Sequence, residues 1–202
     1  MPDWKFQFWD MEAALKLIRD QYSWFLPTFE GYSTVVAKGD ALRPLVLHAY
    51  GGMYVDLDVE CYRPVDTFLE GHDLVLQAEE HNSSEALINA VMASTPRHPL
   101  WLDVISLMME RSASSHNVLF ATGPQVISEA YKSFMKTHDL KTRESGLPKR
   151  QRLTPHVYQL GEFYLPCNWL SQELCAEVDK TEPKPGNLAG FHHWAGSWKV
   201  SL

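Results

Sequence analysis

The stretch GGMYVDLDVE, residues 51–60, places three acidic side chains in a segment that otherwise has the pattern of a buried strand. From Met53 onward apolar and polar residues alternate, which is the period-2 pattern of a β-strand. One face of this strand would carry Tyr54, Asp56, Asp58 and Glu60. Asp56 and Asp58 would then point the same way, roughly 6.5 to 7 Å apart. A hard divalent cation would relieve the repulsion between the two carboxylates.

This pair of acids also indicates the class of ligand. Magnesium and manganese take oxygen ligands, and in proteins they are usually held by one or two carboxylates together with substrate phosphates. The stretch therefore predicts a metal site that serves a substrate carrying phosphate groups.

Composition limits the partners of the chain. With 202 residues, of which 45% are hydrophobic and 12% aromatic, the chain is long enough for one domain with a real core. Its net charge of -7 argues against a nucleic-acid partner or an anionic membrane surface, since both require basic patches. We therefore expect no nucleic acid among its partners, and any phosphate must be held by a local site.

No run of about 18 apolar residues occurs, and the start MPDWKFQFWD has no apolar stretch of the kind found in signal peptides. We expect no membrane span and no targeting segment within this chain. The three cysteines show neither metal-ligand spacing nor the density of a disulfide scaffold, so they leave the redox compartment open.

Elements of two kinds alternate along the chain. Helical spacing of apolar residues predicts a helix that is capped by Asp10 and ends at Pro27, and a second helix over 39–52 with Pro44 in its first turn. Further helices are expected over 83–94, 99–113 and 125–136, and strands over 5–9, 73–78, 156–160 and 161–166. The polar and basic residues 139–154 predict a mobile surface loop. This alternation is typical of a layered α/β domain.

Asp40 and Arg43 are three residues apart in the second helix and therefore share a face. By themselves they could form an ordinary surface ion pair, with the acid favoured by the helix dipole.

The longer segment KGDALRPLVLHAYGGMYVDLDVECYRPVD, residues 38–66, adds a pattern: acid, two residues, arginine, an apolar helix, Gly-Gly, then Tyr-x-Asp-x-Asp. It resembles the sugar-binding DXD region of glycosyltransferases that include the initiating mannosyltransferases and the inositol phosphoceramide mannosyltransferases. The resemblance continues through segments FQFWD, INAVMASTPRHPLW, ATGP, EFYLP and HHWAGSW.

The resemblance implies a single GT-A (Rossmann-like) nucleotide-sugar domain over residues 1–202. It implies an enzyme, a manganese- or magnesium-dependent retaining glycosyltransferase, that moves a sugar, with mannose favoured. The donor would be GDP-mannose or a UDP-sugar, and the acceptor a glycan or glycolipid. Asp58 would be the main metal ligand, Asp56 would touch the metal, ribose or donor sugar, and Asp40 and Arg43 would hold sugar hydroxyls and the diphosphate side.

The same resemblance assigns roles to the C-terminal segment and to two other positions. His192, rather than its neighbour His193, would meet the metal or diphosphate, while Ser197 and Trp198 would lie at the leaving group. We expect this segment to close as a lid, with Gly190 and Gly196 as flexible points. Asn89 and Gly123 would line the donor pocket. The alternative for the histidines and tryptophans is ordinary packing, and for Asn89 a place on a helix surface.

One difference from the family pattern leaves two interpretations open. Family members usually begin with a strand that forms the first edge of the nucleotide site, and this chain starts after it. The domain is thus expected to be N-terminally truncated, either as a fragment of a longer protein or as a relative that keeps the metal motif without full activity. The family favours a Golgi membrane or lumenal location, with the cytoplasm as the alternative. A sequon at Asn82 would fit the lumen.

Two other classes of function compete with glycosyl transfer. A non-catalytic relative would bind a nucleotide or a partner protein. A magnesium phosphatase with an aspartyl nucleophile also uses D-x-D after an apolar strand. It expects Thr or Val two residues after the second Asp, where this chain has Glu60.

Overall fold

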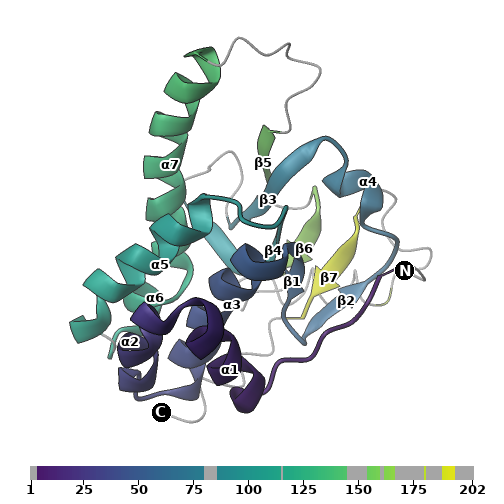
Figure 1. Ribbon diagram of the computed structural model, residues 1–202. Helices are drawn as coiled ribbons and strands as arrows, with labels where there is room; N and C mark the ends of the chain where they lie inside the picture. Colours follow the sequence, from purple (N-terminus) through teal and green to yellow (C-terminus); the bar gives the residue numbers. More distant parts are fainter. Residues whose placement is uncertain are drawn as a thin grey trace.

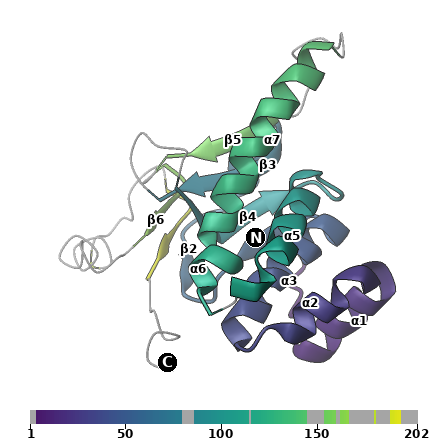
Figure 2. The same ribbon diagram turned by 90° about the vertical axis from the view of Figure 1, so that its left-hand side faces the viewer.

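The computed structural model describes residues 4–79, 86–114, 116–144, 154–159, 162–166, 180 and 188–193. Helices and strands alternate along this part of the chain, and the strands form a four-stranded and a three-stranded sheet. The predicted α/β class is confirmed. Figures 1 and 2 show α1 and α2 at one end of the molecule and the three-stranded sheet at the other.

The larger sheet has mixed strand directions, in the order β1-β4-β3-β5. β4 pairs antiparallel with both β1 and β3, and β5 pairs parallel with β3. The smaller sheet has the order β2-β7-β6, in which β7 is antiparallel to β2 and parallel to β6. The strands are β1 (Gly52–Val55), β2 (Val59–Cys61), β3 (His72–Ala78), β4 (Leu87–Ser94), β5 (Thr154–Tyr158), β6 (Tyr164–Pro166) and β7 (Gly190–His192).

The prediction of one continuous strand from Met53 to Glu60 is wrong, because the strand is interrupted in its middle. β1 ends at Val55 and β2 begins at Val59, and the two lie in different sheets. The backbone N–H of Val59 donates to the carbonyl of Asp56 at 3.1 Å, which closes a turn. The alternation of apolar and polar residues continues through β1 and β2, so the sequence pattern looks like one strand. The pattern cannot show that β1 pairs with β4 whereas β2 pairs with β7.

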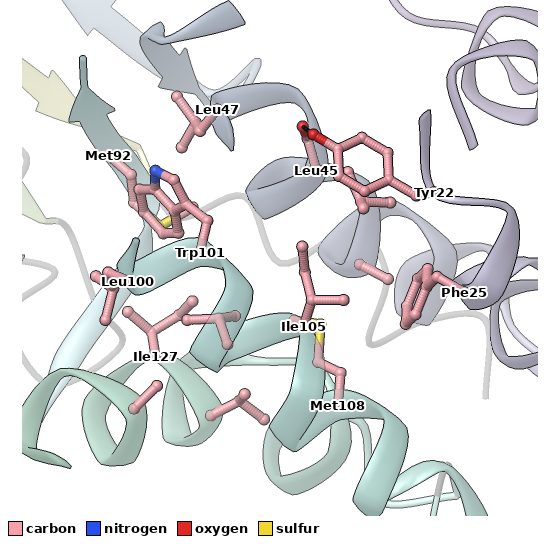
Figure 3. Packing of buried hydrophobic residues seen from close by; sticks show 14 of the residues in the cluster. Tyr22, Phe25, Leu45, Leu47, Met92, Leu100, Trp101, Ile105, Met108 and Ile127 are labelled. Carbon is pink, nitrogen blue, oxygen red and sulfur yellow. Dashed lines mark hydrogen bonds between the residues drawn. The ribbon is translucent and has the colours of Figure 1, made fainter. Parts of the chain in front are cut away.

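The helices pack around one large apolar core. Its largest side chain, Trp101, is fully buried, and its indole N–H donates to the hydroxyl of Ser94 at 2.8 Å, so α5 is tied to β4. Figure 3 shows this ring beside Met92 and Leu100, with Ile105 and Met108 farther along α5. The helices are α1 (Met11–Gln21), α2 (Leu26–Gly31), α3 (Val35–Tyr50), α4 (Asp66–Leu69), α5 (Leu100–Glu110), α6 (Val118–Ala121) and α7 (Pro124–Glu144), with 3-10 turns at Ser23–Phe25 and Ser112–Ser114.

The helix predicted over 83–94 is instead the central strand β4, preceded by residues outside the described part of the chain. Six of the eight residues of β4 are buried. A strand covered on both faces has a nearly continuous apolar sequence, which periodicity cannot separate from a buried helix.

Several boundaries also differ from the expectations. The Asp10 cap is confirmed, but α1 ends at Gln21 and Pro27 lies in the first turn of α2. α3 begins after a Thr34 cap, which puts Pro44 inside the helix. Residues 139–144, expected in a loop, continue α7, and residues 5–9 form no strand. The strands expected near 73–78, 156–160 and 161–166 are confirmed as β3, β5 and β6.

Within the described residues, none of the helices combines the length and the apolar character needed to span a membrane.

Candidate functional site

One face of α3 forms a wall of a cavity of about 1000 Å³. The lining residues of α3 are Val36, Gly39, Asp40 and Arg43, a spacing of three, one and three that keeps them on one side of the helix. β1 and β4, the turn after β1, β7, α6 and α7 supply the other walls. The cavity thus lies where the two sheets meet the helices.

The turn between β1 and β2 carries Asp56 and Asp58, and each is anchored through its backbone. The N–H of Asp56 donates to the carbonyl of Ala90 in β4 at 2.8 Å. The carbonyl of Asp58 accepts from the N–H of His193, just after β7, at 2.9 Å. Because each acid is bound to a different sheet, the junction of the sheets sets the distance between the two carboxylates.

Asp56, Asp58 and His192 each offer a ligand atom within 4.8 Å of the other two. His192 Nε2 and Asp58 Oδ1 are 3.2 Å apart, close to the roughly 3 Å that separates neighbouring ligands of an octahedral ion with bonds of about 2.1 Å. Two carboxylates and one imidazole suit manganese, and magnesium if oxygen ligands complete the shell. These three residues therefore fit a divalent cation.

The pKa of His192 is lowered by burial, although Asp58 and Asp56 act to raise it. A lower pKa favours the neutral imidazole, which is the form that binds a metal.

Arg43 connects the metal-binding candidates to a second group of polar side chains. Its Nη2 lies 3.1 Å from Asp56 Oδ1, and its Nη1 lies 3.2 Å from Asp40 Oδ1. Nη1 also donates to the carbonyl of Asn89 at 2.9 Å. The guanidinium lies 4.7 Å above the ring of Tyr54. Burial alone would lower the pKa of Arg43, but Asp40, Tyr54 and Asp56 together raise it, so the side chain stays charged.

Tyr54 also binds Asp56 directly. Its hydroxyl donates to Asp56 Oδ1 at 2.6 Å, so this oxygen accepts a hydrogen bond from Tyr54 and also forms the ion pair with Arg43. Burial raises the pKa of Tyr54, which keeps the hydroxyl protonated and able to donate. Among the described residues no hydrogen bond reaches the other oxygen, Oδ2. One oxygen of Asp56 is therefore held in place while the other is left for a ligand.

Asp40 is buried and surrounded by hydrogen-bond donors. The side-chain amide of Asn89 donates to its Oδ1 at 3.0 Å, and the hydroxyl of Thr122 donates to its Oδ2 at 3.4 Å. Burial raises the pKa of Asp40 to about 6, against the lowering effect of Arg43. The carboxylate is thus mostly ionised at neutral pH, and it can accept hydrogen bonds from sugar hydroxyls.

Most of the sequence-predicted site residues that the structure describes line this one cavity: Asp40, Arg43, Asp56, Asp58, Asn89 and His192. Gly123 is not among the lining residues. Its N–H donates to the carbonyl of Val118 at 2.8 Å, and an added Cβ would lie 2.9 Å from the Cα of Leu119, so the close turn of the chain against the backbone of α6 requires this glycine. Ser197, Trp198 and the sequon at Asn82 lie outside the described residues.

The two neighbouring histidines take different positions. His192, in β7, faces Asp58, whereas the Nε2 of His193 lies 3.2 Å from Glu60 Oε2 at a more exposed position. The expected flexibility at Gly190 is wrong, because this residue is paired in β7, where an added Cβ would collide with Glu60 and Tyr164.

Sequence reasoning missed the roles of Tyr54 and Thr122 in this network. Tyr54 belongs to the quoted Tyr-x-Asp-x-Asp pattern, so its spacing from Asp56 was an available signal. No such signal existed for Thr122, because it is 82 positions away from Asp40 in the chain.

Comparisons with known proteins identify relatives of the chain. Residues 1–75 match the family described as "Glycosyltransferase sugar-binding region containing DXD motif". The mannosyl phosphorylinositol ceramide synthase CSH1 of Saccharomyces cerevisiae is 33% identical over 149 residues, which cover 72% of this chain and 38% of that protein. Inositol phosphoceramide mannosyltransferase 3 of Schizosaccharomyces pombe is 30% identical over 206 residues, or 96% of this chain and 52% of the relative.

The resemblance to the DXD glycosyltransferases is therefore confirmed. The chain spans between about a third and a half of the length of these curated relatives. Among solved structures, the PaToxG glycosyltransferase is similar with a TM-score of 0.42 and 20% identity, over 70% of this chain and 63% of the other.

Proposed function

We propose that this chain, a relative of the DXD-motif glycosyltransferases, is the catalytic domain of a metal-dependent retaining glycosyltransferase. The reaction would move a sugar, mannose first among the candidates, from a nucleotide-sugar donor to a glycan or glycolipid acceptor. The domain would be of the GT-A type and extend over residues 1–202.

One observation carries the proposal. Side chains from the turn after β1, Asp56 and Asp58, and from β7, His192, converge within 4.8 Å on the wall of a cavity that Asp40, Arg43 and Asn89 also line. A cavity of about 1000 Å³ is large enough for a nucleotide sugar. In a nucleotide-sugar donor the diphosphate is covalently linked to the sugar. A site for such a donor therefore needs cation ligands for the diphosphate close to polar groups that bind the sugar.

The charges of the site suit departure of a nucleoside diphosphate. When bound, a divalent cation would neutralise negative charge that develops on the diphosphate as its bond to the sugar breaks. Asp56, Asp58 and His192 would hold that cation. Arg43 would add a fixed positive charge already oriented by Asp40 and Asp56, and such preorganised groups stabilise the transition state more than the ground state.

The polar groups around α3 would orient the donor sugar. Asp40 and Asn89 present hydrogen-bonding atoms at the cavity wall, and Asp40 is held from both sides by Asn89 and Thr122. A held carboxylate discriminates between hydroxyl positions, since a mismatched sugar leaves a buried polar atom without its partner.

The names of the relatives give the donor and acceptor classes that we propose. CSH1 is named for mannosyl phosphorylinositol ceramide and the fission yeast relative for mannose transfer to inositol phosphoceramide. We propose GDP-mannose as the first donor to test and a sphingolipid headgroup as the first acceptor. We also propose a Golgi location, on the basis of the resemblance to the family.

The alternative functions are a non-catalytic relative that binds a nucleotide or a partner protein, and the D-x-D phosphatase. The family match supports the transferase over the phosphatase. The non-catalytic alternative predicts binding of donor without turnover.

The experiment is a screen of nucleotide sugars with manganese, magnesium or EDTA, followed by thermal unfolding and then by hydrolysis and transfer assays. A donor that binds only the folded state raises the melting temperature. We expect a rise with GDP-mannose that requires the cation. Asp58→Asn should abolish the rise, with Glu60→Gln as a control at a nearby acid outside the cavity. Binding without turnover would support the non-catalytic relative, and no binding of any nucleotide sugar would contradict the proposal.

A further inference from the structure

Gly39 occupies an unusual place in the wall of the cavity. It lies within α3, on the same face as Val36, Asp40 and Arg43, and all four line the cavity. A Cβ added to Gly39 would meet no atom within 4 Å. The position therefore borders open space, beside the polar groups that hold the proposed sugar site.

The backbone of α3 does not require a glycine here. The positive-φ glycines of the described chain are Gly51, Gly52 and Gly71, and Gly39 is not among them. Gly51 is also required by close packing, since its added Cβ would lie 2.6 Å from Pro96. Glycine within a helix is less favourable than alanine, because it loses more conformational freedom on folding. Gly39 thus makes the helix less stable than alanine would, and no steric contact inside the protein requires a glycine at this position.

We propose that Gly39 determines specificity for the donor: the missing side chain leaves room for the transferred sugar against Arg43 and Asp40. This inference rests on the proposed function and adds a prediction about which part of the donor meets α3. The sugar, and not the nucleotide, would occupy the space next to Gly39, because its neighbour in α3, Asp40, contacts Arg43 and Asn89, and all of them line the cavity.

The test combines two substitutions with a matched control. Gly39→Ala and Gly39→Leu introduce side chains of increasing size into the open space. Gly31→Ala and Gly31→Leu are the controls, because Gly31 is also helical and also has no atom within 4 Å of an added Cβ, but it does not line the cavity. All four variants should melt at or above the temperature of the wild type.

The ligand measurements separate sugar from nucleotide. With manganese present, Gly39→Leu should weaken binding of GDP-mannose at least about tenfold, with a smaller effect for Gly39→Ala, since a pocket discriminates roughly 10- to 200-fold for one methylene group. Binding of GDP alone should change less than about twofold, because GDP lacks the sugar. UDP-glucose and UDP form the second donor pair.

Three outcomes would overturn the inference. If the wild type binds a nucleotide sugar and Gly39→Leu binds it equally well, the inference falls while the proposed function stands. If Gly39→Leu weakens GDP as much as GDP-mannose, the residue borders the nucleotide and the assignment to the sugar is wrong. If the wild type binds none of the four ligands, the proposed function and this inference fall together.

Discussion

Two groups of polar side chains share the cavity, and they differ in burial and hydrogen bonding. The inner cluster, Asp40, Arg43, Asn89 and Thr122, lies mainly on α3 and β4, and its acid is almost fully buried between donors. The outer cluster, Asp56, Asp58 and His192, lies at the junction of the two sheets, and its two acids are about one quarter exposed. Arg43 links the clusters through Asp56.

The difference separates groups that stabilise the fold from groups that remain available to a ligand. Buried charges are stable only when paired, so changes in the inner cluster should lower the free energy of unfolding. Partly exposed acids that face each other repel, so changes in the outer cluster should lower binding and leave stability nearly unchanged. Four predictions test this distinction, from the largest expected effect to the smallest.

The largest effect is expected for Asp58→Asn. The substitution removes a negative ligand from the proposed cation site while the backbone bond from His193 remains. Sugar transfer should fall about 10³-fold, and the melting temperature should stay the same or rise. A steady-state assay beside a melting curve checks this. A variant that loses activity only in proportion to its folded fraction would place Asp58 with the structural groups.

Arg43→Met should have the opposite profile, with a large loss of stability. It leaves Asp40 buried without its ion pair, and breaking a buried pair by removing one partner costs about 4 kcal/mol. Chemical denaturation at pH 7 measures the loss. The loss should be smaller at pH 5, where Asp40 can take up a proton. An equal loss at both pH values would show that the ion pair to Asp40 is not its cause.

Asp40 itself should make the stability of the wild type depend on pH. Burial raises its pKa from 3.8 to about 6, so the folded state binds the proton more tightly than the unfolded state. Its contribution to stability is therefore highest below pH 4 and decreases as the pH rises to 6, by up to about 3 kcal/mol at roughly 1.4 kcal/mol per pKa unit. The difference between wild type and Asp40→Asn across this range measures it. A difference that does not change with pH would contradict the raised pKa.

The smallest effect is expected for Tyr54→Phe, which keeps the ring under Arg43 and removes the hydrogen bond to Asp56 Oδ1. Manganese affinity should fall about tenfold, a typical effect of losing a group that orients a metal ligand. Tyr158→Phe is the matched control. It also removes a hydrogen bond donated by a tyrosine hydroxyl, here to the carbonyl of Phe68, but neither residue lines the cavity. Calorimetric titration with manganese should distinguish the two. Equal affinities would assign Tyr54 a purely structural part.

The sequence predicted much of the site because its residues are clustered in the chain. Asp40, Arg43, Asp56 and Asp58 fall within 19 positions of one another, and their spacing alone suggested a shared face and a cation. The resemblance placed Asn89 in the donor pocket, and the alternative was a position on the surface of a helix. It lies instead on the central strand β4, where its side chain reaches Asp40. The local sequence of β4 could not reveal this, since its neighbours in the sheet come from distant segments.

The sequence by itself determined the α/β class, the cap of α1, the helical face that carries Asp40 and Arg43, and the two acids beside the Gly-Gly turn. These features depend on contacts between residues that are near in the chain. Only the tertiary structure decided that the acids lie on a turn between two sheets, that Asn89 lies on the central strand β4, and that Thr122 holds Asp40. Each of these depends on which distant strand or helix packs alongside, and that choice is made by burial of the whole core rather than by the spacing of neighbouring residues.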